Sequence, residues 1–285
     1  MKSQRTRRAA LPPALLLLLL LLPSCGFFGR EKSGNLEFML DEETDAYTLA
    51  YYTDTSKVRE LVIPDTFRGK PVTAIGRLAV SSADTLEKIV IGKNITAIDS
   101  WGIVDCRYLK AIEVAGDNPA FRSLDGVLYT RDGTRLITYP NAHTAAYSSS
   151  GKLLRKASYA VAPGTKVVGH CAFYKCYGLE AVELPDSVEI IEERAFHKCD
   201  ALAAIQFPEG LTSIGKDAFL GCESLTSITL PSSIREIGTF AFYNAKNLRT
   251  ISIGAAEADV TLGDKWYPTA AGRKIPVDII WANGQ

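Results

Sequence analysis

Cysteine and histidine residues gather in two short stretches of the chain, "HCAFYKC" at residues 170–176 and "HKC" at residues 197–199. Structural zinc sites use four such side chains in a tetrahedral arrangement, usually as closely spaced pairs. The side chains that one zinc site could combine here are Cys171, Cys176, His197 and Cys199. In an exported protein the cysteines could instead form disulfides. They could also be small buried packing residues, which is how a free cysteine commonly behaves.

A regular internal repeat positions these side chains. Each copy opens on an aliphatic residue, continues with a phenylalanine and then a leucine, and each of these three residues recurs 23 positions later. The copies run through Val168, Ile191, Ile214 and Ile237, then Phe173, Phe196, Phe219 and Phe242, then Leu179, Leu202, Leu225 and Leu248. Two degenerate copies begin earlier, at Ile75 and Ile98, and the strand-like "ELVIP" at 60–64 precedes them. Such self-similarity predicts a repeat architecture.

The repeat also divides the cysteines and histidines into two groups. Four cysteines lie eight positions after the opening aliphatic residue, and alanine fills the same position in the outer copies. This column contains Cys106, Cys176, Cys199 and Cys222, with Ala83 and Ala245 as its alanines. A position that accepts alanine or cysteine requires a small buried side chain, which favours packing over metal binding. Disulfides between column neighbours such as Cys176 and Cys199 stay open, because strands about 4.8 Å apart bring their Cα atoms into range.

The remaining members of the apparent cluster occupy unrelated repeat positions. Cys171 lies outside the column, and we expect it to be the one reactive thiol. His143, His170 and His197 share no repeat position, so we interpret them as surface loop residues, although any one of them could serve as a general base. The chain contains no GxSxG, HExxH, P-loop or GxGxxG signature. We therefore expect no catalytic residues, no metal site and no cofactor.

Each unit changes its periodicity from one half to the other. "LxxIxLP" alternates as a short strand with one buried side, and "IxxxAFxxC" has the spacing of an irregular or short helical turn. A unit with one apolar face cannot bury that face alone, but stacked neighbours bury each other. The sequence predicts an α/β-type solenoid with short parallel strands on one face and irregular or short helical turns on the other.

The consensus "LxxIxLPxx(V/I/L)xxIGxxAFxxC" resembles the BspA-like leucine-rich repeat family of bacterial surface lipoproteins, and "VIPDTFRGKPVTAIG" resembles its opening repeat. The resemblance covers most of residues 45–254. It implies a curved, non-enzymatic leucine-rich-repeat solenoid that is exposed on the cell surface and binds host proteins or other cells. The copy at 75–92 lacks the Phe and Cys, and the last copy has Ala245 in place of Cys and Gly254 in place of Pro.

The repeat is interrupted after Ala115. Asp125-Gly126 and Asp132-Gly133 are hairpin signals in a stretch where apolar residues alternate, and "YSSSGKLLRKASYAVAPGTKVV" predicts another strand or two. After the last repeat, Trp266 and Trp281 are expected to cover the apolar edge of the final turn. The predicted organisation is 1–24 signal peptide, 25–44 lipid-anchored tether, 45–114 N-terminal repeats, 115–166 an elongated repeat with a hairpin insert, 167–258 C-terminal repeats and 259–285 a C-terminal cap.

The first residues have the pattern of an export signal. Lys2, Arg5, Arg7 and Arg8 precede an apolar run that is too short to span a membrane comfortably, and "LPSC" at 22–25 resembles a bacterial lipobox. That resemblance implies cleavage before Cys25 and lipidation of its thiol, and the alternative is an ordinary secretory signal. Export changes the balance from 32 basic and 32 acidic residues to 28 and 32, with no basic run, which argues against nucleic acid as a partner. We expect an extracytoplasmic protein anchored in the bacterial envelope, with the outer membrane or cell surface as its location.

The strand residues that point away from the core are candidates for binding another protein. In "LxxIxLP" these are small and weakly charged, so a partner backbone could approach closely. The predicted ligand-binding residues on this strand face are Lys88, Glu113, Glu183, Gln206, Thr229 and Ser252. The insert offers Phe121, Tyr129 and Tyr139 as alternative aromatic anchors, although these residues also suit a core. Two alternatives to a protein-binding surface are a scaffold without a host ligand and a metal-binding or enzymatic solenoid. Glycan binding would need aromatic platforms, which this face lacks.

Overall fold

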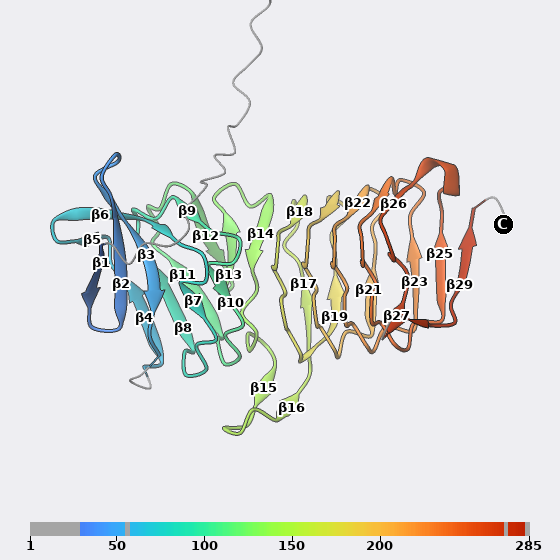
Figure 1. Cartoon of the computed structure of the whole chain (residues 1–285), viewed down its shortest axis with the longest axis horizontal. Coiled ribbons are helices and arrows are strands. Elements are labelled where there is room, and N and C mark those ends of the chain that lie inside the picture. Colours follow the sequence, from blue (N-terminus) through green and yellow to red (C-terminus); the bar gives the residue numbers. More distant parts are fainter. Residues whose placement is uncertain (1–28, 55–57, 271–272, 283–285) are drawn as a thin grey trace, which may run out of the picture.

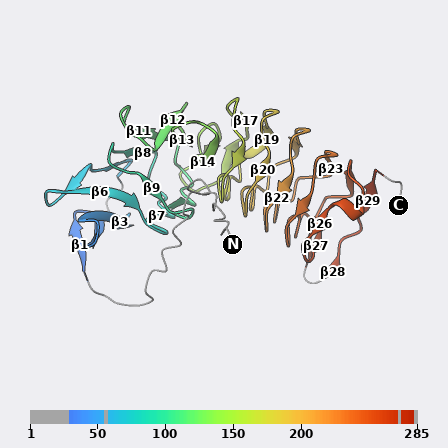
Figure 2. The same cartoon turned by 90° about the horizontal axis from the view of Figure 1, so that it is seen from above.

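The chain forms an elongated row of stacked turns, each of which lies against the next (Figure 1). The computed structural model describes residues 29–54, 58–270 and 273–282, and the predicted signal peptide and Cys25 lie outside them. Figure 2 shows that the row bends along its length, so that the N-terminal β1 (Arg30–Ser33) and the C-terminal β28 (Arg273–Lys274) lie on the same side of the middle turns.

The N-terminal end is closed by an antiparallel sheet. β1 pairs with β2 (Leu36–Asp41), β2 pairs with β3 (Ala46–Tyr52), and β3 joins β6 (Lys70–Ile75) in parallel. The sequence placed a tether at 25–44, and the structure corrects this for the part that it describes. The alternation of Leu36, Phe38 and Leu40 lets β2 bury Phe38 completely, and this covers the end of the first turn.

The "LxxIxL" segments form strands along one side of the row. Buried and exposed residues alternate in them: β23 buries Ile228 and Leu230 and exposes Ser227 and Thr229. Neighbours are parallel and pair equivalent positions of successive copies, as Ala181 does with Ala204. The three sheets on this side contain β4 (Glu60–Ile63), β8 (Lys88–Ile91) and β11 (Ala111–Val114), then β17 (Ala157–Ala160), β19 (Leu179–Glu183) and β21 (Ala204–Gln206), then β23 (Ser227–Leu230), β25 (Thr250–Ile253) and β29 (Asp278–Trp281).

A second side of each turn is a two-residue strand at the aliphatic residue that opens the repeat. These short strands continue the insert into one eight-stranded sheet: β12 (Phe121–Leu124), β13 (Val127–Thr130), β14 (Arg135–Thr138), β18 (Val167–Val168), β20 (Ile190–Ile191), β22 (Ser213–Ile214), β24 (Glu236–Ile237) and β26 (Thr261–Leu262). The other short elements are β5 (Thr66–Phe67), β7 (Val80–Ser81), β9 (Ala97–Ile98), β10 (Ile103–Val104), β15 (Ala146–Tyr147), β16 (Leu153–Arg155), β27 (Thr269–Ala270) and the 3-10 helix η1 (Glu257–Asp259).

The third side carries the "AFxxC" segments, which form hydrogen-bonded turns instead of helices. In one such turn the backbone N–H groups of Arg194, Phe196 and Lys198 donate to carbonyl oxygens of the following turn, at 2.7–2.9 Å. Two columns in this region adopt positive φ, with Arg194 at 57° and Lys198 at 56°. The bonds to both neighbouring turns hold this left-handed backbone, which non-glycine residues rarely adopt. Within the described residues η1 is the one helical element, so these segments are the irregular turns of the expectation and not the short helical ones.

Four phenylalanines stack through the interior of the C-terminal turns. The rings of Phe173 and Phe196 lie 4.8 Å apart at 7°, those of Phe196 and Phe219 5.0 Å apart at 8°, and those of Phe219 and Phe242 5.4 Å apart at 10°. All four side chains are fully buried. The constant period places each ring directly over the last, so the stack follows from the in-register pairing of the strands.

The insert joins two halves of the core. Successive residues of β13 point to opposite sides: Leu128 packs with the N-terminal core, whereas Val127 and Tyr129 pack with the C-terminal core. β13 forms hairpins with both β12 and β14, as the two Asp-Gly pairs predict, and β14 then joins β18 in parallel. The insert is therefore a wall shared by the two cores.

The C-terminal segment continues part of the repeat. β29 pairs in parallel with β25, so it adds one more strand to the row. Trp266 and Trp281 are buried, with ring centroids 6.4 Å apart, and they cover the last Phe-containing turn as expected.

We expect Phe196→Ala to lower the free energy of unfolding by about 3–5 kcal/mol, because it removes a fully buried ring with neighbours on both faces. Phe240→Ala is the matched control. Phe240 is half-buried and lies outside the stack, so its loss should change stability by about 1 kcal/mol or less. Urea unfolding of both variants measures the difference, and equal losses would contradict the role assigned to the stack.

Candidate functional site

The cysteine column lies in the interior beside the phenylalanine stack. Cys106, Cys176, Cys199 and Cys222 are all buried, and with Cys171 they are free thiols. The Sγ of Cys199 lies 3.1 Å from the carbonyl oxygen of Phe173, one turn earlier, and the Sγ of Cys222 lies 3.1 Å from that of Phe196. Each thiol thus donates a weak hydrogen bond to the preceding turn while filling a small space. Burial raises the pKa of both thiols well above their usual range.

Cys171 is buried as well, so its expected reactivity is wrong. Its side chain is 4% exposed, and burial raises the pKa of its thiol to about 12. Its place in the variable part of the repeat had suggested exposure. Its backbone adopts φ of 57° in the turn.

The histidines are half-buried packing residues, and the expectation of surface loop positions is wrong for them. His197 stacks on Tyr174 with ring centroids 5.1 Å apart, and desolvation lowers the pKa of its imidazole to about 4. Desolvation also lowers the pKa of His170, which packs edge-on against Trp101. Among the described residues no three His, Cys, Asp or Glu side chains converge as a metal-binding group.

The strand face differs between its N-terminal and C-terminal parts. Lys88, in the middle strand of the first sheet, forms ion pairs with Glu113 at 2.9 Å and with Glu60 at 3.7 Å. The hydrogen bond to Glu113 raises the pKa of the Lys88 amine. These charges satisfy one another across the three strands. The structure therefore brings together two of the predicted binding residues, Lys88 and Glu113, in an ion pair between neighbouring strands.

The C-terminal part of the strand face is small-residued and almost uncharged. Glu183 stands opposite Gln206 in β19 and β21, and Thr229 opposite Ser252 in β23 and β25. Glu183, Gln206 and Thr229 are exposed, and Ser252 is half-buried. These four predicted residues thus line one row that runs along the turns, and no ion pair involves Glu183 within the described part of the chain.

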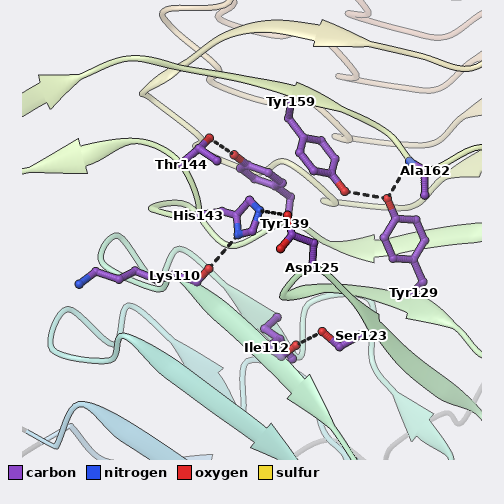
Figure 3. Close-up of polar contacts among 10 residues, drawn as sticks. All are labelled: Lys110, Ile112, Ser123, Asp125, Tyr129, Tyr139, His143, Thr144, Tyr159 and Ala162. Atoms are coloured by element: carbon purple, nitrogen blue, oxygen red, sulfur yellow. Dashed lines mark hydrogen bonds and ion pairs between the residues drawn. The ribbon is translucent and has the colours of Figure 1, made fainter.

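The aromatic residues of the insert belong to the core. Phe121, Tyr129 and Tyr139 are all less than a tenth exposed. In Figure 3 the Tyr129 and Tyr159 hydroxyls are hydrogen-bonded at 2.9 Å, and the Tyr139 hydroxyl meets that of Thr144 at 3.0 Å. His143 accompanies them, with Nδ1 3.0 Å from the carbonyl oxygen of Lys110. The two hydroxyl contacts lie within the insert, and the His143 contact joins it to the turn before it. Because the three aromatic side chains are buried, the alternative of surface anchors is wrong.

The hairpin of β15 and β16 lies in the stretch that was expected to contribute another strand or two. The loop "SSSGK" at 148–152 is its turn, and Gly151 has φ of 79° there. Figure 1 shows this hairpin projecting away from the row of turns. A cavity of about 320 Å³ lies between the hairpin and the starts of β8 and β11, with Glu87, Tyr108, Lys110, His143, Tyr147 and Arg155 among its lining residues. The serine-rich turn between two apolar pairs was the available signal.

Comparison with known proteins agrees with this architecture. None of the curated protein sequences matches this chain. Two solved structures are similar: the pneumococcal vaccine antigen PcpA, with 17% identity over 89% of this chain and 87% of that one and a TM-score of 0.55, and a leucine-rich repeat protein from Eubacterium ventriosum, with 16% identity over 84% of each chain and a TM-score of 0.53. Both support the fold. No helix among the described residues has the length and apolar character to cross a membrane.

The thiol assignments predict that the exported chain carrying Cys25→Ala is inert to a disulfide reagent while folded. A pKa near 12 leaves roughly a thousandfold less thiolate than an ordinary cysteine has, and burial blocks access. In concentrated guanidinium chloride all five described thiols should react. One fast equivalent in the folded protein, lost on Cys171→Ala, would contradict the burial of that thiol.

The model of the BspA type leucine-rich repeat region matches residues 46–124 and 165–261 in six copies. These ranges cover more than half of the chain and leave out residues 125–164, most of the hairpin insert, where the structure departs from the regular turn. The chain therefore belongs to the BspA-type leucine-rich repeat family of bacterial proteins.

Proposed function

We propose that this protein is anchored by a lipid to the bacterial envelope and binds another protein through the surface of its solenoid, with adhesion to host or other cells as its role. The observation that carries the proposal is the row of small exposed side chains on β19, β21, β23 and β25. Equivalent residues pair from strand to strand, so the row of side chains is continuous within each pair of strands. A partner backbone can approach small side chains closely, which favours an extended contact.

The internal ion pairs of the first sheet direct the proposal to the C-terminal strands. Lys88 is held by Glu60 and Glu113, and a partner would have to compete with those contacts. Gln206 and Thr229 are uncharged and exposed, so a partner that approaches them displaces no ion pair. We therefore assign the binding contact to the part of the strand face around Gln206 and Thr229.

The anchor that we propose is a lipid on Cys25. The lipobox-like "LPSC" supports it, and the start of β1 limits how far the fold could lie from the anchor. β1 begins at Arg30, so only residues 26–29 would separate the lipidated residue from the N-terminal cap. At about 3.5 Å per residue these four residues span at most about 14 Å. The N-terminal end of the solenoid would thus stay close to the membrane, with its remaining turns available to a partner.

The binding surface is tested with the fluorescently labelled exported chain on intact host cells and on other bacteria. Gln206→Arg combined with Thr229→Arg should lower saturable binding by about tenfold, because two large cations stand where the partner backbone approaches. Ser232→Arg with Ala258→Arg adds the same charge at other exposed positions and should bind as the original chain does. Flow cytometry measures both. Saturable binding that the strand-face variant leaves unchanged would overturn the assignment of this face.

The anchor is tested by labelling the producing cells with a palmitate analogue. Cys25→Ala should abolish lipid labelling and release the protein from the membrane fraction, whereas Cys171→Ala, a buried thiol, should leave both unchanged. Protease treatment of intact cells then locates the solenoid: loss of the solenoid supports adhesion, and protection favours a scaffold within the envelope. A Cys25→Ala chain that still carries the lipid would exclude the lipobox interpretation.

A further inference from the structure

Charge is distributed unevenly along this chain. Residues 133–179 contain six lysines and arginines and no aspartate or glutamate. Because the whole chain has 32 basic and 32 acidic residues, the remainder holds 26 basic against 32 acidic. The segment that includes the β15–β16 hairpin is thus a basic insert in an otherwise acidic protein.

Most of the cations in this segment are neutralised by carboxylates from other turns. Four ion pairs do so: Arg135 with Glu192 at 2.6 Å, Lys156 with Glu180 at 3.0 Å, Lys166 with Glu189 at 3.3 Å, and Lys175 with Asp105 at 2.5 Å. Lys152 and Arg155 have no ion pair in the described residues, and both are exposed. The cations left over are therefore the two on the projecting hairpin.

A third cation lies directly beneath the hairpin turn. A Cβ at Gly151 would clash with the guanidinium of Arg107, so this side chain underlies the loop. Next to it, the Tyr108 hydroxyl donates a hydrogen bond of 3.0 Å to the carbonyl oxygen of Ser148, which ties the loop to the turn below. Arg155 donates to the carbonyl oxygen of Thr144 at 2.9 Å. The Tyr108 bond thus holds the hairpin turn in place, and the Thr144 bond orients the Arg155 guanidinium.

The hairpin also carries an apolar residue in the open. Leu154 is 65% exposed, the largest exposure of any large apolar side chain in the described part of the chain. It lies between Leu153, which packs inward near Gly178, and Arg155, which lines the cavity beside the hairpin. An exposed leucine with Lys152 and Arg155 close to it in the sequence has the composition of a protein contact, with an apolar anchor and a charged rim.

We propose that the β15–β16 hairpin is a second contact site of this protein, which recognises an acidic segment of a partner protein that carries an apolar side chain. Lys152, Arg155 and Arg107 supply the complementary charge, Leu154 supplies the anchor, and the adjoining cavity offers space for a side chain of the partner. This deepens the proposed function, on which it rests, because it names the chemistry of the partner.

A protein fits these features better than the other anionic partners. Burying one leucine contributes about 1.5–3 kcal/mol, which is small for holding a protein at a membrane surface but typical of a single anchor in an interface. An anionic glycan would use the cations and leave the leucine without a role. Charge that is complementary to the rim raises the rate of association and selects the partner.

The test measures fluorescence anisotropy of a labelled peptide of alternating glutamate and leucine with the exported chain, at low and at physiological salt. Peptide binding should weaken as the salt concentration rises. The affinity should fall about tenfold in the double variant Lys152→Glu, Arg155→Glu and about fivefold in Leu154→Ser. Lys93→Glu with Lys216→Glu changes the net charge equally at exposed positions elsewhere and should leave binding intact. Thermal melts verify that each variant is folded.

Three results would overturn the inference. The first is an equal loss of peptide affinity in the hairpin and control variants. The second is that the original chain does not bind the glutamate-leucine peptide. The third is that a sulfated glycan or vesicles with anionic lipid bind through the hairpin cations while the peptide does not. Cell binding separates this inference from the proposed function. If the charge-reversed hairpin binds cells normally, the hairpin site fails and the proposed function stands, whereas the original chain failing to bind any cell would overturn the proposed function itself.

Discussion

Each turn of this chain must return its backbone to hydrogen-bonding distance of the turn before it, and the rest of the structure follows from that constraint. The bonds run along all three sides: between the "LxxIxL" strands, between the two-residue strands, and between the "AFxxC" turns. A constant repeat length satisfies all three sides together. It also places chemically equivalent side chains over one another, which is why phenylalanines stack on phenylalanines and cysteines follow cysteines.

The same constraint explains why residues that could do chemistry are used for packing. Cys199 occupies a repeat position that alanine fills in the outer copies, and its thiol reaches a carbonyl oxygen of the preceding turn at 3.1 Å. His197 contributes a ring that stacks on Tyr174, and its low pKa of about 4 is the consequence of that burial. Residues free of the packing role lie on the strand face and on the projecting hairpin. The binding that we propose therefore falls to surfaces that the stacked turns hold in place.

Much of the fold could be predicted from the sequence because the repeat is its dominant signal. The strands, the cysteine column, the two Asp-Gly hairpins and the tryptophan cap all follow from spacing and turn chemistry. The backbone of the "AFxxC" segment did not follow. The spacing of apolar residues there left an irregular or a short helical turn open. Bonds between turns stabilise a left-handed backbone at Arg194 and Lys198, and neither residue type predicts that conformation. Residues 30–41 were also interpreted wrongly, because the apolar alternation of the N-terminal cap is short and lies next to the predicted anchor.

The candidate sites were less accessible from the sequence. The exposed strand residues could be named from alternation alone, but the ion pair of Lys88 with Glu113 depends on which strands become neighbours. The hairpin charges could be understood only after the structure had shown which lysines and arginines were already paired. Periodicity thus predicts which residues are buried, whereas the remaining charge of a surface depends on contacts between distant turns.

Hydrogen exchange of the backbone amides in the "AFxxC" turns tests the central claim most directly. The N–H groups of Phe173, Phe196, Phe219 and Phe242 each donate to the following turn at 2.7–2.9 Å, although they lie outside any helix or regular strand. We expect these four amides to exchange as slowly as the amides of the buried strands, through opening of whole turns. Fast exchange at all four, typical of surface loops, would contradict a solenoid held together by hydrogen bonds between its turns.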